Sequence, residues 1–137
     1  MTQEEKELLL RDLCSRLPYG VKIELTWWVM DEGTCINTTL EPDHVEQLLN
    51  DEYGDTEIKP YLRPMSSMTE EEKAQLSQYA CIGEDLNGEF VDEVQRKDCA
   101  AYIDWLNKHH FDYRELIERG LAIEVTEENN PYKTELL

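Results

Sequence analysis

The sequence predicts an α+β fold: a single domain with a small antiparallel sheet and three or four flanking helices. Some segments have apolar residues three and four positions apart, which is typical of amphipathic helices, and others alternate at every second position, which is typical of strands. A length of 137 residues with 40% apolar content suits one domain with a buried core. We therefore expect one α+β domain over residues 1–125 and a polar, mobile tail over residues 126–137.

The N-terminal segments predict a helix followed by a β-hairpin. Thr2 and Glu5 form a T-x-x-E capping box, and leucines follow at helical spacing until Pro18 ends the helix. Residues 21–30 alternate between apolar and polar side chains, which indicates a strand with one wet face. A short turn then leads to residues 35–40, so the two strands are expected to pair as an antiparallel hairpin.

The middle of the chain predicts two more helices separated by an extended segment. Residues 42–54 begin with proline and aspartate and carry apolar residues at helical spacing. Residues 59–65 have two prolines four positions apart, which excludes a helix interior and favours an extended segment along the edge of the sheet. A second T-x-x-E box opens a helix over residues 69–79, and the glycines of residues 83–88 interrupt the pattern.

The last part of the domain predicts a long helix, a short helix and a short strand. Residues 98–109 have apolar residues at helical spacing. Asp112 begins a D-x-x-E cap for a short helix through Leu116, and Gly120 is suited to a left-handed stop. Residues 121–125 then resume as an apolar strand.

Charge is the most unusual property of the chain. The 31 Asp and Glu residues outnumber the 13 Lys and Arg residues, and the formal net charge is −18. Such a chain repels nucleic acid and is attracted to basic surfaces, with a strong dependence on salt. We therefore expect a basic protein as the partner and no direct nucleic-acid binding. A solvated acidic face that serves only solubility is the alternative.

The acidic residues are concentrated in one block. Between Ile23 and Ile58 there are ten Asp or Glu residues and no Lys or Arg, and a second stretch without Lys or Arg covers residues 74–95. If both stretches folded onto one side, their carboxylates could imitate a phosphate backbone and occupy the nucleic-acid channel of a partner. The candidate partner-binding residues are Glu24, Trp28, Asp31, Glu32, Glu41, Asp43, Glu46, Asp51, Glu52 and Asp55.

Trp28 belongs to this set because strand alternation sends Trp27 and Trp28 to opposite faces of the sheet. One indole is then expected in the core. The other is either exposed, as in a protein-binding hot spot, or covered by a helix on that side.

Cysteine spacing and the absence of apolar runs limit the compartment. The four cysteines are widely spaced, which favours free thiols in a reducing compartment, and Cys14 and Cys99 lie in helical patterns where a cysteine is expected to be buried. No run approaches the roughly 20 apolar residues of a membrane span. We expect a cytoplasmic protein without a cofactor or a structural metal.

No catalytic motif is present: the sequence lacks G-x-S-x-G, G-x-G-x-x-G and the P-loop pattern. The strongest competing hypothesis is a small enzyme or metal-binding domain that uses His109, His110 and Asp112. Adjacent histidines on a helix project about 100° apart, whereas metal-binding pairs are spaced i, i+4. We therefore interpret the histidines as the end of a helix and Asp112 as a cap.

Three strings carry a resemblance to a known group of proteins. They are R-L-P-Y-G-V-K at residues 16–22, I-K-P-Y-L-R-P-M-S-S-M-T at residues 58–69 and W-L-N-K-H-H-F-D-Y-R at residues 105–114. With these strings the chain resembles, from its first helix to Val125, a group of uncharacterised small acidic proteins from gut-bacterial, prophage and phage genomes. The resemblance implies no activity. It implies a mobile-element context, in which a phage anti-defence inhibitor such as an anti-CRISPR protein would fit.

Overall fold

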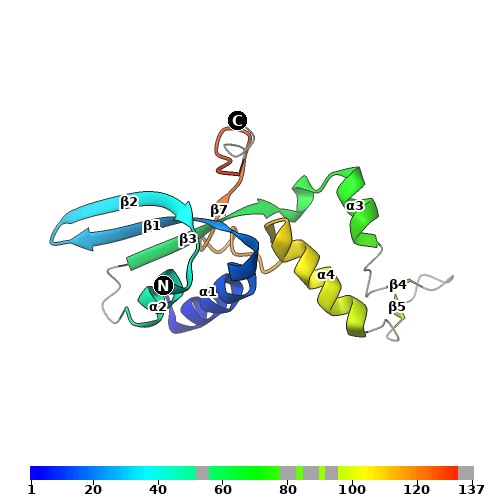
Figure 1. Ribbon diagram of the computed structural model, residues 1–137, viewed down its shortest axis with the longest axis horizontal. Helices are drawn as coiled ribbons and strands as arrows, with labels where there is room; N and C mark the ends of the chain where they lie inside the picture. The colour runs from blue at the N-terminus through cyan, green and yellow to red at the C-terminus, as the bar shows by residue number, and fades with distance from the viewer. Residues whose placement is uncertain (52–55, 78–82, 85–89, 92–95, 133–137) are drawn as a thin grey trace.

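The computed structural model describes residues 1–51, 56–77, 83–84, 90–91 and 96–132. Helices and a mixed sheet combine in one α+β fold, as the sequence predicts (Figure 1). In chain order the elements are α1 (Gln3–Arg16), η1 (Leu17–Tyr19), β1 (Lys22–Val29), β2 (Glu32–Thr39), α2 (Pro42–Leu49), β3 (Thr56–Pro64), η2 (Met65–Ser67), α3 (Glu70–Ser77), β4 (Gly83–Glu84), β5 (Phe90–Val91), α4 (Arg96–Lys108), β6 (Phe111–Asp112) and β7 (Ile123–Glu124).

The main sheet has the strand order β2-β1-β3-β6, with β7 also paired to β3. β1 pairs antiparallel with β2 and β3, which confirms the predicted hairpin and the antiparallel core of the sheet. β6 and β7 add to β3 in parallel, so the complete sheet is mixed. Each of these two strands has only two residues. β7 lies within the strand predicted over residues 121–125, whereas β6 was not predicted.

β3 is an interior strand, which corrects the expectation that residues 59–65 run along the edge of the sheet. β1 pairs with β3 from Thr56 to Pro60, and the parallel partners then begin at Tyr61 and end at Pro64. Both prolines therefore lie at the end of a ladder, where a missing N–H costs least. Their positions mark where β3 changes partners.

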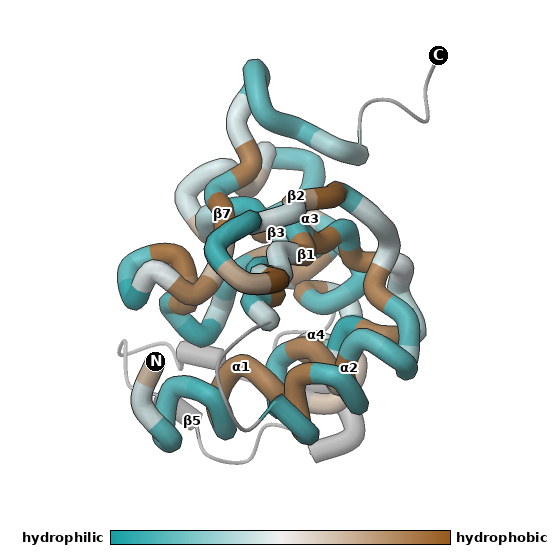
Figure 2. The backbone as a smooth tube through the Cα atoms, turned by 90° about the vertical axis from the view of Figure 1, so that its left-hand side faces the viewer, coloured by the Kyte–Doolittle hydropathy of each residue, from teal (hydrophilic) through white to brown (hydrophobic). Residues whose placement is uncertain are grey.

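α1 and α2 cover one face of the sheet (Figure 2). Thr2 caps α1 as predicted, since its hydroxyl accepts a hydrogen bond of 3.1 Å from the backbone N–H of Glu5. The core between helices and sheet is formed by buried apolar residues from α1, β1, α2, β3 and the 116–122 segment: Leu9, Leu13, Val21, Ile23, Leu25, Leu40, Leu48, Ile58, Leu62, Leu116, Leu121 and Ala122.

Cys14 is exposed, which corrects the expectation that it is buried. Leu9 and Leu13 form the buried stripe of α1, and Cys14 follows Leu13 about 100° around the helix. The same expectation for Cys99 falls on a side chain outside the described part of the chain. α4 itself spans Arg96–Lys108, close to the predicted range of residues 98–109.

A buried ionic network joins α1 to the segment after α4. The Asp12 carboxylate accepts hydrogen bonds of 2.8 Å from the Arg16 Nε and from the Arg114 guanidinium, and both Asp12 and Arg16 are fully buried. Arg16 also donates a hydrogen bond of 2.6 Å to the backbone oxygen of Phe111. Arg114 donates in addition to the Tyr113 hydroxyl, 2.8 Å away. The network therefore fixes the position of β6 against the first helix.

The segment after β6 is a turn and not the predicted short helix. The Asp112 carboxylate accepts hydrogen bonds of 3.0 Å from the backbone N–H groups of Leu116 and Ile117 and stabilises this turn, whereas the predicted helix cap would accept from the N–H of Arg114 or Glu115. Glu115 has a φ of +61°, in the left-handed region, which interrupts any helix at this point. Gly120 has a φ of +74° and provides the left-handed stop that the sequence predicts.

Residues 126–132 lie on the side of the sheet opposite to α1 and α2, and Tyr132 returns to contact it (Figures 1 and 2). The Tyr132 hydroxyl donates a hydrogen bond of 2.8 Å to the backbone oxygen of Tyr61 and accepts one of 3.0 Å from the backbone N–H of Lys22. The Tyr132 ring also stacks on His110 at a centroid distance of 4.1 Å. The expected mobile tail over residues 126–137 is thus docked as far as Tyr132, and residues 133–137 lie outside the described residues.

α3 begins at the predicted capping box. Glu72 accepts a hydrogen bond of 3.0 Å from the backbone N–H of Thr69, whose hydroxyl accepts one of 3.2 Å from the backbone N–H of Glu72. Both guanidinium ends of Arg63 donate hydrogen bonds of 2.7 Å to the Glu72 carboxylate. The predicted end of this helix at residue 79 lies outside the described residues. In the described ranges, none of the helices combines the length and apolar character that a membrane crossing requires.

The hydrogen bonds from Arg63 lower the pKa of Glu72 from its ordinary value to about 2. The ionised Glu72 carboxylate therefore contributes fully to the free energy of unfolding above pH 4.5, and this contribution is lost as the pH falls from about 4.5 to about 2. We expect Glu72→Gln to lower the free energy of unfolding at pH 7 by about 1.5–3 kcal/mol, since it removes charge-assisted hydrogen bonds. The difference between wild type and variant should shrink across that acid window.

Urea unfolding at a series of pH values measures this difference. Glu70→Gln is the matched control, because Glu70 pairs with Lys73 at an exposed position. A Glu72→Gln difference that stays constant from pH 7 to pH 2 would contradict the assignment of the low pKa.

Candidate protein interface

The β1–β2 hairpin projects beyond the helices that cover the rest of the sheet (Figure 1). Its pairing is regular from Lys22 opposite Thr39 to Val29 opposite Glu32, with Met30 and Asp31 as the connecting residues. The four residues that end β1 and begin the turn change from half-buried to fully exposed along the strand. The tip is therefore a part of the sheet that the helix layer does not cover.

Several apolar side chains of the hairpin are exposed. Trp28 is 41% exposed, Val29 66% and Met30 97%, and Ile36 on β2 is 43% exposed. Leu49, at the end of α2, is 61% exposed. Single exposed apolar residues are common on proteins, but a group on neighbouring strands is typical of a surface that binds a partner.

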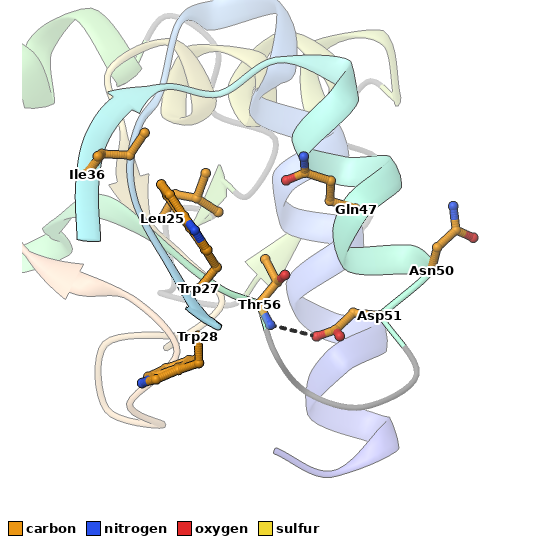
Figure 3. A pocket seen from close by; sticks show the side chains of 8 residues that line it. All are labelled: Leu25, Trp27, Trp28, Ile36, Gln47, Asn50, Asp51 and Thr56. Carbon is orange, nitrogen blue, oxygen red and sulfur yellow. Dashed lines mark hydrogen bonds between the residues drawn. The ribbon is translucent and has the colours of Figure 1, made fainter. Parts of the chain in front are cut away.

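The two tryptophans point to opposite faces, as the sequence predicts. Trp27 is half-buried and packs against the core on the helix side, whereas Trp28 lies on the other face of the hairpin (Figure 3). Trp28 stands opposite Gly33 in the ladder, and a Cβ atom at Gly33 would come within 2.8 Å of the indole Nε1. Gly33 thus leaves room for the indole to lie across β2.

Met30 has a backbone conformation that is unfavourable for a residue other than glycine. Its φ is +59°, in the left-handed region, where the Cβ atom of an L-residue meets the following carbonyl oxygen. Glycine or asparagine would suit both the conformation and the solvent exposure. Met30 is therefore an exposed apolar residue in a conformation that does not favour the stability of the hairpin.

Met30→Gly is expected to raise the free energy of unfolding by up to about 1 kcal/mol, because glycine relieves the left-handed strain. Part of the gain is offset by the larger entropy of glycine in the unfolded chain. Urea unfolding measures the change. Asp31→Gly is the matched control at the neighbouring turn position and should lower stability; equal losses in both variants would contradict the interpretation.

A groove of about 610 Å³ lies between the underside of the hairpin and α2 (Figure 3). One wall is apolar and comes from the sheet, and the other is polar and comes from α2 and the residues that follow it. Asp51 fixes the floor by accepting a hydrogen bond of 3.1 Å from the backbone N–H of Thr56, the first residue of β3. The groove is lined by Leu25, Trp27, Trp28, Ile36, Gln47, Asn50, Asp51 and Thr56.

Carboxylates stand on both elements that border the groove. Asp31 and Glu32 are exposed at the tip of the hairpin, and Asp43 and Glu46 are exposed on α2. The chain between residues 23 and 58 contains no Lys or Arg to neutralise them. These four carboxylates, two on the hairpin and two on α2, are called the acidic rim below.

Three other predicted site residues have structural contacts. Glu41 caps α2, where its side chain accepts from the backbone N–H of His44 while the His44 Nδ1 accepts from the Glu41 N–H at 3.0 Å. Glu24 is half-buried and accepts a hydrogen bond of 3.4 Å from the Tyr61 hydroxyl. Asp51 holds Thr56, as described above. Asp31, Glu32, Asp43 and Glu46 are therefore exposed on the hairpin and α2, and Trp28 lies on the other face of the hairpin. Glu24, Glu41 and Asp51 have contacts within the fold.

Burial and the neighbouring Glu24 raise the pKa of the Tyr61 hydroxyl. The phenol thus stays protonated at neutral pH and acts as a donor to Glu24 and, at 2.9 Å, to the Asn37 side chain. This contact holds Glu24 against β3 and away from the tip.

Glu52 and Asp55, the last two predicted residues, lie outside the described part of the chain. So does most of the second acidic stretch over residues 74–95, including its residues 85–89 and 92–95. The idea that both stretches form one continuous phosphate-like face stays a prediction.

The histidine cluster separates into three independent contacts. The His109 ring lies 4.2 Å from that of Trp105, the His110 ring stacks on Tyr132, and the Asp112 carboxylate binds two backbone N–H groups. Burial lowers the pKa of His109. Within the described residues, no group of three His, Cys, Asp or Glu side chains is arranged to hold a metal ion.

The sequence did not point to Val29, Met30, Ile36 or Leu49 as surface residues. Val29 and Ile36 fall on the apolar side of an alternating hairpin, which normally indicates burial. Their exposure depends on the hairpin being longer than the helix layer beneath it, and no local pattern reports that length. A methionine next to aspartate at the expected turn was the one available signal, because turns favour glycine and asparagine.

Comparison with known proteins adds no relative from which a role could be transferred. No family model, no curated protein and no solved structure matches this chain.

Proposed function

We propose that this protein is a non-catalytic acidic binding protein that engages a basic partner protein through the end of the molecule formed by the β1–β2 hairpin and α2. One observation carries the proposal: the hairpin tip exposes apolar side chains, Met30 in a disfavoured conformation among them, next to Asp31 and Glu32, and the neighbouring α2 exposes two more carboxylates. Aromatic and methionine anchors with charged rims are typical of protein interfaces.

A nucleic-acid-binding protein is the partner class that best fits the charge. The basic surface of such a protein is complementary to the phosphate backbone, and therefore also to a rim of carboxylates without lysine or arginine. A nucleic-acid mimic, and in a mobile element an anti-defence inhibitor such as an anti-CRISPR protein, are the narrower forms of this proposal. The apolar tip distinguishes the surface from a pure charge mimic, because part of its affinity should survive high salt.

The cytoplasm is the compartment that we propose. Cys14 and Cys35 are exposed free thiols, which suits a reducing environment. A basic nucleic-acid-binding partner would be encountered in the same compartment.

The proposal is tested by capture from a lysate of the host cell at low salt, with four exposed carboxylates of the rim neutralised together. The variant is Asp31→Asn/Glu32→Gln/Asp43→Asn/Glu46→Gln. We expect wild type to retain a basic protein and the variant to capture at least about tenfold less of it, because interface charges contribute both to the rate of association and to affinity. Repeating the capture at about 0.5 M salt, where the Debye length is about 4 Å, should weaken the wild-type interaction.

A matched control removes the same number of carboxylates from exposed positions between residues 118 and 128. It is Glu118→Gln/Glu124→Gln/Glu127→Gln/Glu128→Gln. The control should bind like wild type. Equal binding by all three proteins would show that the rim of the hairpin and α2 is not the binding surface.

A further inference from the structure

β2 is an open edge of the sheet. It is the first strand in the order β2-β1-β3-β6, it has eight residues, and the first six of them are exposed. Natural proteins usually protect such an edge with lysine, proline or a bulge. β2 contains no Lys or Pro, and its register with β1 is continuous over all eight residues.

The backbone groups that face outward follow from the pairing. The N–H of Leu40 donates a hydrogen bond of 2.9 Å to the oxygen of Val21, so Leu40 and every second residue before it face β1. The alternate residues direct their N–H and C=O groups toward solvent. These are Gly33, Cys35, Asn37 and Thr39.

The surroundings of this edge are apolar on the helix side and acidic at the ends of the strand. On the helix side, Ile36 borders the groove under the hairpin and is 43% exposed, so an added strand could bury apolar side chains beside it. The ends of β2 carry carboxylates, with Glu32 at its start and Glu41 shortly after its end. A strand that pairs here would be favoured by apolar residues at alternate positions and basic residues between them.

We propose that β2 accepts an extended, basic segment of the partner protein as an added strand of the sheet, with apolar side chains over Ile36 and Trp27 and lysine or arginine side chains at the intervening positions. The inference rests on the proposed function and names the way in which that surface binds. A second copy of this chain is a poor occupant, because each copy carries a net charge of −18 and no basic residue on β2. Strand addition supplies backbone hydrogen bonds for affinity and alternate side chains for specificity.

The probe is a synthetic peptide of four Lys-Val repeats with blocked ends. Two substitutions at Cys35 distinguish the contribution of its backbone N–H to peptide binding from that of its side chain. Cys35→Pro removes one outward N–H and places the ring at the open edge, where proline is tolerated. Cys35→Ala removes the thiol and keeps the N–H. We expect Cys35→Pro to weaken peptide binding at least about tenfold, through one or two lost hydrogen bonds and the blocked approach, and Cys35→Ala to bind like wild type.

Amide hydrogen exchange on the wild-type protein gives a readout that does not depend on the proline variant folding. Saturation with the peptide should slow exchange at Gly33, Cys35, Asn37 and Thr39, while Thr34 and Ile36 are already protected by β1. A peptide of four Lys-Ala-Ala repeats, with the same charge and a helical preference, should not protect them.

The outcomes separate the two proposals. If the Lys-Val peptide binds, and binds more weakly to the rim-neutralised variant, but the outward amides stay unprotected and Cys35→Pro binds like Cys35→Ala, strand addition is wrong and the acidic surface stands. If the peptide binds equally to wild type and to the rim-neutralised variant, or does not bind at low salt, the acidic surface itself is contradicted, and the strand proposal is overturned with it.

Discussion

Asp12→Ala is expected to lower the free energy of unfolding by about 3–5 kcal/mol, the largest stability effect of any single change considered for this fold. The carboxylate is fully buried and accepts hydrogen bonds from both Arg16 and Arg114. Its removal leaves the buried guanidinium of Arg16 without its counter-ion while the hydrogen bond to Phe111 holds it in place. Because typical domains are stable by only about 5–15 kcal/mol, the midpoint of urea unfolding should fall steeply.

The network also predicts an order of effects. Arg114→Ala should cost less than Asp12→Ala, because the Arg114 side chain is 18% exposed and solvent can compensate for part of the loss. Glu7→Ala is the control on the same helix, at an exposed position. A loss for Asp12→Ala no larger than that of Glu7→Ala would contradict the role of the network.

Trp28→Ala is expected to weaken binding of the captured partner about 30-fold or more, equivalent to about 2 kcal/mol. The indole is large, exposed, and held across Gly33 on the face opposite to the core. The free energy of unfolding should fall by about 1 kcal/mol, because the contact that is lost is a cross-strand pair with glycine. Titration with the purified partner measures the affinity, and urea unfolding measures the stability.

Ile103→Ala is the control for Trp28→Ala. Ile103 is 36% exposed on α4, a helix that does not contribute to the hairpin or the groove. It should leave the affinity unchanged. An equal loss in both variants would indicate a general effect of truncating surface apolar residues and would remove Trp28 from the interface.

Local patterns in the sequence were sufficient for α1–α4, the hairpin and the caps of α1 and α3. Thr2 and Thr69 were each recognised from a capping pattern, and each accepts the expected backbone hydrogen bond. These features depend on residues three to five positions apart, so a short window contains the whole signal. The split of Trp27 and Trp28 between two faces has the same origin, because strand alternation is local.

Features that depend on distant residues could not be predicted. The parallel pairing of β6 and β7 with β3 places β3 inside the sheet, although its prolines suggested an edge. The expected short helix after Asp112 is replaced by a turn, because Glu115 adopts a left-handed conformation. The docking of Tyr132 on Tyr61 and His110 joins residues far apart in the chain, so composition alone suggested a free tail.

The candidate interface could be predicted from the sequence only in part. The acidic block was visible in the sequence, and four of its carboxylates do lie at the exposed hairpin and α2. The sequence could not separate these from Glu24, Glu41 and Asp51, whose contacts within the fold involve Tyr61, His44 and Thr56. The apolar tip was not predicted, because its exposure follows from how far the hairpin extends past α1 and α2.

The most direct test of the acidic binding surface is the affinity of wild type and of the rim-neutralised variant for the captured partner, measured by titration from about 0.05 M to about 0.5 M salt. We expect the wild-type affinity to fall steeply with salt, and the variant to bind more weakly at low salt with a flatter dependence, so that the two curves converge as screening increases. Two curves that coincide at every salt concentration would contradict the account, because the carboxylates of the hairpin and α2 would then contribute nothing to recognition.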